Sequence, residues 1–324
     1  MKRKRAMLVI NPISGTRSKA GLRQAVESKL GAAGIETTTL FTQKVDDAAA
    51  FSKKAVDENF DIVISAGGDG TVNQIANVLS HTPVTLGILP FGSGNGFARS
   101  LGIPQDSQEA LKIILAGFSI TCDRGLVDNH PFYCTFGTGL DAAVSKKFAQ
   151  MKKRGRATYL RSLFREFLKY KSQPYAISLD GKVITEKAII VAVCNARQYG
   201  NNAYIAPKAN LTDGLLDVTV VHSGNPLETV MMGMELMTGN IDRNTRIETF
   251  KVKETIITRL SDGPVHIDGE PLIMGKRLKI SCDPMALKVF APEKETSFKP
   301  IVSPLRAMIE DVKYDVMARL RTLG

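Results

Sequence analysis

The chain has 324 residues, of which 44% are apolar, and its 43 Lys and Arg residues outnumber 32 Asp and Glu residues, giving a formal net charge of +11. This length and apolar content predict one or two buried cores, and we expect two domains. The charge predicts an anionic partner. The cysteines and histidines lack ligand spacing, which argues against a disulfide framework and a zinc site. We expect the histidines to be surface or capping residues: His81, His130, His222 and His266.

The first part of the chain alternates predicted strands and helices. Short apolar runs predict strands at residues 7–10, 61–64 and 84–90, and helical patterns cover residues 21–30, 46–58, 72–79 and 107–115. This alternation predicts βαβ units and a parallel sheet. Each of these strands ends in a loop rich in Gly, Ser, Asn or Thr. In a parallel sheet such loops meet at the carboxyl edge, where ligands of open α/β sheets bind.

The loop after residues 61–64 carries three glycines and a carboxylate, in the sequence Gly67-Gly68-Asp69-Gly70-Thr71. Glycines let the backbone approach a ligand closely, and the N–H groups of the helix that follows attract phosphate. The Asp69 carboxylate would repel a phosphate unless a cation or a reacting hydroxyl stands between them. The loop therefore indicates metal-assisted phosphate chemistry. The alternative, glycines that serve only a turn, does not explain three polar loops at one edge. Their spacing fits neither the dinucleotide fingerprint nor the P-loop.

From residue 124 the pattern changes to short strands with few helices, which predicts a β-sandwich. The predicted strands are residues 132–136, 176–179, 182–196, 216–222, 247–252, 255–258, 264–267, 278–282 and 286–290. Asp180-Gly181 predicts a hairpin turn between two of them. We therefore predict a three-layer α/β domain over residues 1–123, a sandwich-like β domain over residues 124–291, and an amphipathic helical extension over residues 292–324.

Four motifs occur in the order and at the distances typical of one family of lipid kinases. They are Asn11-Pro12-x-Ser14-Gly15, the Gly67-to-Thr71 block, Pro90-x-Gly92-Ser93-Gly94-Asn95 and Asp268-Gly269-Glu270. Together they resemble the diacylglycerol kinase and sphingosine kinase catalytic-domain family over about residues 7–290. The Gly-Gly-Asp-Gly block alone is shared with NAD kinases and 6-phosphofructokinases. The resemblance implies a kinase with its active site in the cleft between the two domains.

The resemblance also implies a site for ATP in the first domain. The residues that would hold the phosphates and sugar are Asn11, Ser14, Gly67, Gly68, Asp69, Gly70, Thr71, Ser93 and Asn95. Thr42 resembles the family threonine near the adenine or ribose, and the alternative for it is a helix N-terminal residue. Asp69 resembles the aspartate beside the transferred phosphate and its Mg²⁺.

The second domain would supply the base and a metal loop. By resemblance Glu270 accepts the proton of the lipid hydroxyl, while Asp268 and Gly269 set the turn; the alternative is a simple hairpin turn. Residues 210–215 resemble a loop in which the Asp213 carboxylate and the carbonyls of Asn210 and Leu215 bind Mg²⁺ or Ca²⁺. A plain turn between strands is the alternative there.

One segment departs from the family pattern. Bacterial diacylglycerol kinases commonly read Gly-Thr-x-Asn-Asp where this chain reads Gly92-Ser93-Gly94-Asn95-Gly96, so the second aspartate is absent. The form found here resembles that of long-chain-base kinases. Asp141 could then pair with the ammonium of a sphingoid base, or it could cap the helix that follows it. We expect a sphingoid base to be favoured over diacylglycerol.

Charge and hydropathy bear on partners and location. Residues 146–171 contain ten basic residues and one acidic residue, and residues 157–168 add an apolar stripe at helical spacing. The basic residues indicate an anionic membrane surface, while the stripe itself is assigned to core packing. Only 6% of residues are aromatic, and no RNA- or DNA-binding motif occurs, which argues against nucleic acid. Without a long apolar run, we expect a cytoplasmic, peripherally membrane-associated protein.

The last predicted helix follows Pro304 and reaches beyond the family resemblance. Packing on the first domain is the role we favour for it. Pairing with a second protomer to form a homodimer and contact with a membrane are the alternatives.

These observations favour an ATP-dependent, Mg²⁺-requiring kinase that phosphorylates the primary hydroxyl of a sphingoid base or diacylglycerol. An NAD kinase-like enzyme is the alternative among enzymes, and the Asp268-Gly269-Glu270 motif argues against it. A non-catalytic lipid- or nucleotide-binding regulator is the alternative outside enzymes. The presence of Asp69 and Glu270 argues against a regulator, and the loss of the aspartate at Gly96 argues weakly for one.

Overall fold

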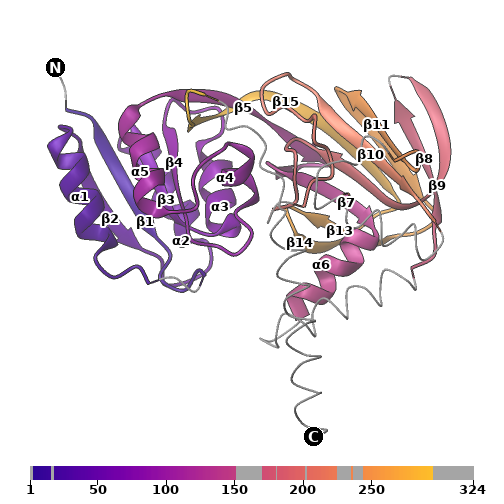
Figure 1. The fold of residues 1–324 in the computed structure, drawn as a ribbon, viewed down its shortest axis with the longest axis horizontal. Coiled ribbons are helices and arrows are strands. Elements are labelled where there is room, and N and C mark those ends of the chain that lie inside the picture. Colours follow the sequence, from indigo (N-terminus) through magenta and orange to yellow (C-terminus); the bar gives the residue numbers. More distant parts are fainter. Residues whose placement is uncertain are drawn as a thin grey trace, which may run out of the picture.

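The computed structural model describes residues 3–15, 18–150, 170–179, 181–200, 203–224, 235 and 244–294. The predicted helices at residues 157–168 and after residue 304 lie outside the described residues. Figure 1 shows an N-terminal unit and a strand-rich unit side by side, with long strands running between them. None of the helices in the described part of the chain combines the length and apolar character needed to span a bilayer.

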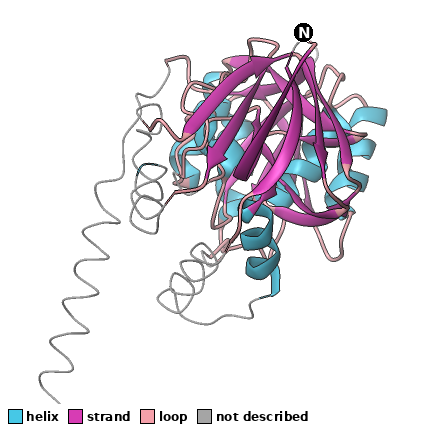
Figure 2. Ribbon diagram, turned by 90° about the vertical axis from the view of Figure 1, so that its right-hand side faces the viewer, coloured by secondary structure: helices cyan, strands magenta, loops and turns pink. Residues whose placement is uncertain are grey.

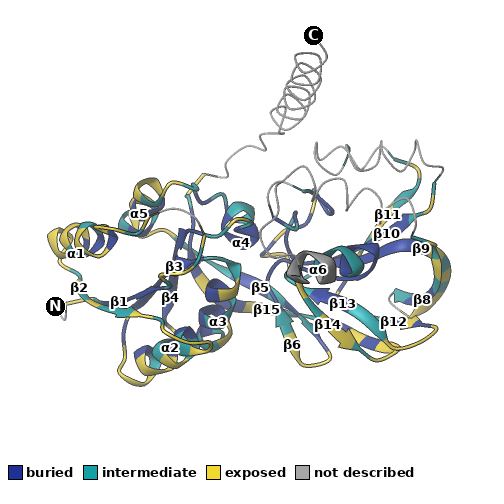
Figure 3. Ribbon diagram, turned by 90° about the horizontal axis from the view of Figure 1, so that it is seen from below, coloured by how far each residue is buried: buried dark blue, intermediate teal, exposed yellow. Residues whose placement is uncertain are grey.

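The N-terminal unit is a parallel sheet covered by helices on both faces. Its strands, in the spatial order β4-β3-β1-β2, are β1 (Arg5–Ile10), β2 (Glu36–Phe41), β3 (Ile62–Gly67) and β4 (Thr85–Pro90). Its helices are α1 (Leu22–Ala32), α2 (Asp47–Asp57), α3 (Asp69–Leu79), α4 (Gly96–Ser100) and α5 (Ser107–Ala116). Helices α2 and α3 lie on one face, and α1 and α5 lie on the other (Figure 3). Lys29 of α1 donates to Gln108 of α5 at 2.6 Å. The predicted three-layer α/β architecture is confirmed.

Whether a strand can be predicted from the sequence depends on how far the strand is buried. Strands β3 and β4 are buried along their whole length because helices cover both faces, so each reads as a continuous apolar run. Strand β2 lies at the edge of the sheet, has only exposed and partly buried residues, and carries three threonines. It has no apolar run, and the sequence did not predict it.

The second unit is built from antiparallel strands. These are β5 (Ser119–Val127), β6 (His130–Phe132), β7 (Thr135–Gly139), β8 (Gln173–Leu179), β9 (Lys182–Cys194), β10 (Leu216–His222), β11 (Ile247–Val252), β12 (Glu254–Arg259), β13 (Gly263–Ile267), β14 (Glu270–Met274) and β15 (Arg277–Phe290). Helix α6 (Leu140–Gln150) lies beneath them in Figure 2. Their inward-facing residues form a separate apolar core that includes Val193, Val218 and Ile257. The predicted sandwich-like β domain is confirmed.

Strand β15 joins the two units. It pairs antiparallel with β5 and β12 and parallel with β4, so that all strands of the described residues belong to one continuous sheet. The prediction of two strands at residues 278–282 and 286–290 is wrong. They are one strand whose register shifts between Asp283 and Leu287, where Met285 has a φ of 53°. The residues at this irregularity read like a turn, so the sequence predicted two strands.

The predicted domain boundary at residue 123 falls inside β5. The division of the chain at residues 123 and 291 therefore stays a prediction. The single strand predicted at residues 132–136 is wrong, because β6 ends at Phe132 and β7 begins at Thr135. The backbone N–H groups between them bind a carboxylate of the site instead of a neighbouring strand.

Candidate active site

Three loops converge at the carboxyl ends of β1, β3 and β4, as the sequence predicts. The Asn11 N–H donates to the Ala66 carbonyl at 3.0 Å, and its Nδ2 donates to Thr71 Oγ1 at 3.0 Å. The loops after β3 and β4 pack backbone against backbone, since a Cβ atom at Gly92 would lie 2.7 Å from the Cα of Gly68. Glycine is required at this contact because no side chain fits between the two loops.

Asp69 links these loops through hydrogen bonds to the backbone. Its Oδ2 accepts the N–H of Asn95 and its Oδ1 accepts the N–H of Gly96, both at 2.7 Å. Burial raises the pKa of the Asp69 carboxyl group, although the backbone hydrogen bonds oppose that rise. At Gly96 a Cβ atom would lie 3.0 Å from the Tyr199 carbonyl oxygen, so the family's aspartate would be crowded there. This contact gives a physical reason for the departure from the family pattern.

A cavity of about 630 Å³ opens beside these loops. Six of its lining residues are predicted nucleotide contacts: Asn11, Ser14, Thr42, Gly68, Gly70 and Thr71. Two further lining residues, Ile13 and Val45, expose 88% and 78% of their surface. Exposed apolar side chains beside a glycine-rich, polar surface suit a ligand that has both a flat apolar part and an anionic part.

The other predicted nucleotide residues do not line this cavity. Asn95 is 3% exposed, and its Nδ2 donates to the Gly92 carbonyl and to Gln105 Oε1, so its side chain stabilises the loop. Ser93 is exposed on that loop. Gly67 packs against the Thr71 side chain, since a Cβ atom at Gly67 would lie 2.6 Å from the Thr71 Cβ. A helix N-terminal role for Thr42 is wrong, because α2 begins at Asp47.

Sequence reasoning missed Lys19. Its Nζ donates to the Ser14 carbonyl at 2.5 Å and lies 4.8 Å from the ring centroid of Phe91. Burial lowers the pKa of this ammonium group. The ammonium therefore lies between the first and third loops. Among 43 basic residues, no local pattern marks Lys19 as different.

The Asp268-Gly269-Glu270 motif forms the turn between β13 and β14. Asp268 and Gly269 have φ values of 49° and 86°, as the predicted hairpin turn requires. The Asp268 carboxylate accepts the N–H groups of Tyr133, Cys134 and Thr135 at 2.8–2.9 Å. Burial raises the pKa of this carboxyl group against the effect of these bonds. These contacts also interrupt the strand predicted at residues 132–136.

Two contacts bring this turn to the first unit. Nδ2 of Asn73, on α3, donates to Asp268 Oδ2 at 3.0 Å. A Cβ atom at Gly70 would lie 3.4 Å from Oε1 of Glu270, so this exposed carboxylate lies over the first turn of α3. Gly70 also lines the cavity, so Glu270 lies close to its wall, and Asp69 precedes Gly70 in the first turn of α3.

The prediction of a surface or capping role for His266 is wrong. The residue is 1% exposed, and its Nε2 lies 3.1 Å from Oδ2 of Asp141. The same Asp141 oxygen accepts the Tyr199 hydroxyl at 3.1 Å, and Oδ1 accepts the N–H of Ala142 at 2.8 Å. Gly137 leaves the space for this contact, since a Cβ atom there would collide with both Asp141 and His266.

In the predicted metal loop, the Asp213 carboxylate forms an ion pair with Lys251. Oδ2 of Asp213 lies 2.6 Å from Lys251 Nζ, and Oδ1 accepts the N–H of Leu215 at 3.1 Å. The Asn210 side-chain oxygen accepts from the N–H and hydroxyl of Thr212. Across the described residues, no group of three or more His, Cys, Asp or Glu side chains could hold a metal ion. The predicted ligand set uses one carboxylate and two backbone carbonyls, so the metal role of Asn210, Asp213 and Leu215 stays a prediction.

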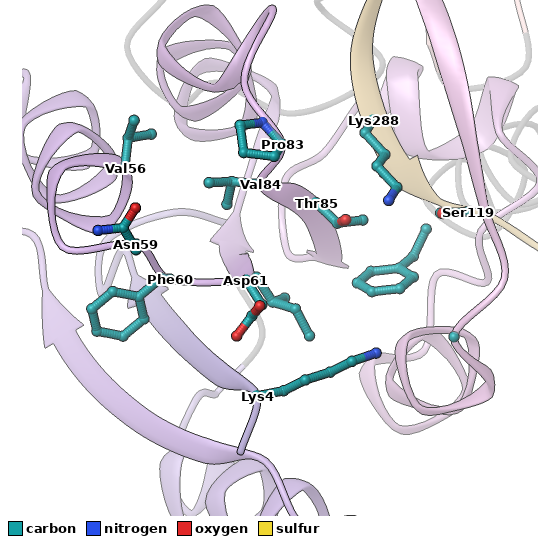
Figure 4. Close-up of a pocket in the computed structure, with 13 residues that line it drawn as sticks. Lys4, Val56, Asn59, Phe60, Asp61, Pro83, Val84, Thr85, Ser119 and Lys288 are labelled. Carbon is teal, nitrogen blue, oxygen red and sulfur yellow. The ribbon is translucent and has the colours of Figure 1, made fainter. Parts of the chain in front are cut away.

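A second pocket, of about 490 Å³, lies at the opposite edge of the sheet (Figure 4). It is formed near the amino ends of β3 and β4, and Lys4, Asp61 and Lys288 lie around it. None of the predicted site residues lines this pocket. It does not belong to the site formed by the glycine loops and Glu270.

Comparison with known proteins agrees with this geometry. The model of the diacylglycerol kinase catalytic domain matches residues 5–127, and that of the YegS C-terminal NAD kinase beta sandwich-like domain matches residues 134–291. Proteins named diacylglycerol kinase from Staphylococcus aureus strains bovine RF122 / ET3-1 and MRSA252 are 31% identical over 273 residues, which is 83% of this chain and 86% of theirs. The chain belongs to the diacylglycerol kinase catalytic-domain family. The predicted family and lipid kinase class are confirmed.

Solved structures lead to the same family. A crystal structure provisionally named as a diacylglycerol kinase, from Bacillus anthracis str. Sterne, superposes with a TM-score of 0.75 at 25% identity. The superposition covers 90% of this chain and 99% of the other. A second structure from the same organism gives a TM-score of 0.73 at 25% identity. The arrangement of both units is therefore that of these relatives.

Proposed function

We propose that this lipid kinase transfers the γ-phosphoryl group of ATP, bound as its Mg²⁺ complex, to the primary hydroxyl of diacylglycerol at an anionic membrane surface. The position of Glu270 is the observation that carries this proposal. An exposed carboxylate from the second unit lies over Gly70, at the edge of a glycine-lined cavity of the first unit. The net charge of +11 supports a reaction at an anionic surface.

The cavity has the parts that ATP requires. The apolar side chains of Ile13 and Val45 would contact the adenine, and the loop of Gly68 and Gly70 would hold the phosphates at the N-terminus of α3. Lys19 would offset part of the phosphate charge. Asp69 keeps the second and third loops in register, which positions the γ-phosphate for attack.

Glu270 would then act on the acceptor. The lipid hydroxyl oxygen attacks the γ-phosphorus while the bond from that phosphorus to the β–γ bridging oxygen breaks, and ADP leaves. The proton of the hydroxyl passes to Glu270. Because a carboxylate is a weak base for an alcohol, the proton moves late, as the new oxygen–phosphorus bond forms.

The contacts of Asp141 favour diacylglycerol over a sphingoid base. Both oxygens of this carboxylate already accept hydrogen bonds, from Ala142, Tyr199 and His266. Asp141 is 8% exposed, so an ammonium would have little access to it, whereas diacylglycerol needs no carboxylate. The names of the Staphylococcus aureus relatives also support diacylglycerol. These observations support diacylglycerol as the substrate in place of the sphingoid base expected from the sequence.

A substrate panel tests this proposal. The purified full chain is supplied with labelled ATP, Mg²⁺ and vesicles that contain diacylglycerol, dihydrosphingosine or no acceptor, and NAD is tested in parallel. We expect labelled phosphatidic acid to be the main product. Preferred phosphorylation of dihydrosphingosine would restore Asp141 as a substrate contact. Labelled NADP without any labelled lipid would contradict the proposal.

A further inference from the structure

A cluster of three polar side chains, two of them buried, lies directly behind the turn that carries Glu270. Its members are Asp141 at the start of α6, His266 on β13 and Tyr199, which follows β9. Asp141 and His266 are 8% and 1% exposed, and the rings of Tyr199 and His266 meet edge to face with centroids 5.5 Å apart. The phosphoryl transfer described above uses none of these three side chains.

Hydrogen bonds at both ring nitrogens orient the imidazole of His266. The N–H of Gly269 donates to Nδ1 of His266 at 3.4 Å, so Nδ1 carries no hydrogen. The hydrogen must then be on Nε2, which donates to Asp141 Oδ2 at 3.1 Å. Burial and the nearby Asp141 charge raise the pKa of the Tyr199 hydroxyl well above its usual value, so Tyr199 remains a donor to the same oxygen. His266 therefore bridges the turn and α6 through its two ring nitrogens.

The turn is closed by the pairing of Ile267 with Glu270, and on one side the N–H of Asp268 donates to the Thr135 carbonyl at 2.8 Å. Asp268 and Gly269 adopt left-handed backbone conformations, and Gly269 and Glu270 are exposed. Asp268 fixes one side of the turn through its bonds to residues 133–135 and Asn73. On its inner side, the N–H of Gly269 donates to Nδ1 of His266. The carboxylate of Glu270 comes from the very next residue.

We propose that His266 is a positioning residue, which links the N–H of Gly269 to Asp141 and thereby fixes the orientation of Glu270. The inference rests on the proposed function only for the role of Glu270 in transfer. It assigns Asp141 to holding this imidazole in place. Gly137, paired with His266 across β7 and β13, is required because any side chain there would displace the cluster.

Four variants of the full chain test this role. His266→Ala removes both hydrogen bonds. His266→Asn keeps an oxygen near the position of Nδ1, and His266→Gln keeps an N–H donor near that of Nε2. Val265→Ala is the matched control, since Val265 is a buried neighbour on the same strand that contributes only apolar packing.

Amide hydrogen exchange of residues 264–274 and steady-state kinetics are measured at a temperature at which all variants are folded. For His266→Ala we expect exchange at Gly269 to rise about tenfold or more. We expect its kcat to fall about 10-fold to 100-fold with an unchanged KM for ATP, because the base is misplaced while the nucleotide loops are intact. His266→Asn should recover more of the kcat than His266→Gln. Val265→Ala should lower the melting temperature and leave kcat unchanged.

Two results would overturn the inference. One is a His266→Ala protein with the same exchange at Gly269 and the same kcat as Val265→Ala. The other is full recovery by His266→Gln but not by His266→Asn, which would place the effect at Asp141 and not at the turn. The exchange measurement needs no substrate. If the wild-type chain phosphorylates no lipid, the proposed function fails while the contact of His266 with the turn is still tested.

Discussion

At the scale of single residues, Asp69 combines a structural contact with a proposed place beside the phosphates. The sequence marks it as a carboxylate in a phosphate loop. The structure adds that both of its oxygens accept backbone N–H groups from the neighbouring loop. A neutral amide at this position would retain the shape of the side chain but place an NH₂ group against one of these N–H groups. Replacement of Asp69 should therefore affect folding as well as catalysis.

For Asp69→Asn we expect a loss of stability of about 1–3 kcal/mol, since one buried donor is left without an acceptor. We also expect loss of phosphoryl transfer, because the two loops no longer hold the phosphates in register. Chemical denaturation and the lipid kinase assay measure the two effects. Asp57→Asn on the exposed end of α2 is the control and should change stability by less than about 0.5 kcal/mol. Equal stability of the two variants would show that Asp69 does not hold the loops together.

At the scale of elements, the close approach of the loops after β3 and β4 determines the shape of the cavity. A methyl group at Gly92 would lie 2.7 Å from both the Cα of Gly68 and Oδ1 of Asn95. Gly92→Ala should therefore push the loops apart, destabilise the protein by about 1–3 kcal/mol and raise the KM for ATP. Thermal unfolding and initial rates at varied ATP measure these effects.

Gly31→Ala is the matched control for this substitution. Gly31 lies inside α1 with open space where its Cβ would be, so alanine there should stabilise the chain by about 0.5–1 kcal/mol. A Gly92→Ala protein that binds ATP as well as Gly31→Ala would mean that the loop contact does not shape the nucleotide site.

An acid-sensitive contact joins β5 and β15 to the end of α3. Oδ2 of Asp283 accepts from Arg124 at 2.8 Å and lies 2.9 Å from His81 Nε2. Partial burial opposes ionisation, but the bonds to His81 and Arg124 outweigh it and lower the pKa of Asp283. Since the folded-state pKa lies below the unfolded value of about 3.9, this contact stabilises the fold above about pH 4. Its contribution is lost as the pH falls through the folded-state pKa.

We expect Asp283→Asn to be less stable than the wild type at pH 7, by about 1 kcal/mol or less. The difference should shrink as the pH is lowered below about 4, because the wild-type carboxylate then becomes protonated. Denaturant unfolding of both proteins between pH 7 and pH 3 measures this. A stability difference that stays constant over this range would show that ionised Asp283 makes no net contribution.

At the scale of the whole molecule, the features that have a local sequence pattern could be predicted, and those that depend on contacts between distant residues could not. The buried strands β3 and β4, the glycine loops and the Asp268-Gly269 turn all have local signals and were predicted. His266 could not be assigned, because its partner Asp141 is 125 residues away in the chain. Edge strand β2 lacks an apolar run, and the irregularity near Met285 made β15 look like two strands.

The site also depends on the association of the two units. Asn73 of α3 binds Asp268 across 195 residues of sequence, and this contact brings Glu270 over Gly70. The first unit supplies the loops for the nucleotide, and the second supplies the proposed base. Neither unit contains the whole arrangement by itself.

Transfer of labelled phosphate from ATP to diacylglycerol by wild type and Glu270→Gln tests the central claim most directly. Glu270 is exposed, so the substitution should leave the melting temperature unchanged, and Glu254→Gln on β12 is a matched exposed control. We predict that Glu270→Gln lowers kcat by about 10²-fold to 10⁴-fold, as loss of a general base does. Glu254→Gln should retain the wild-type rate. A Glu270→Gln protein that phosphorylates diacylglycerol at the wild-type rate would contradict the account.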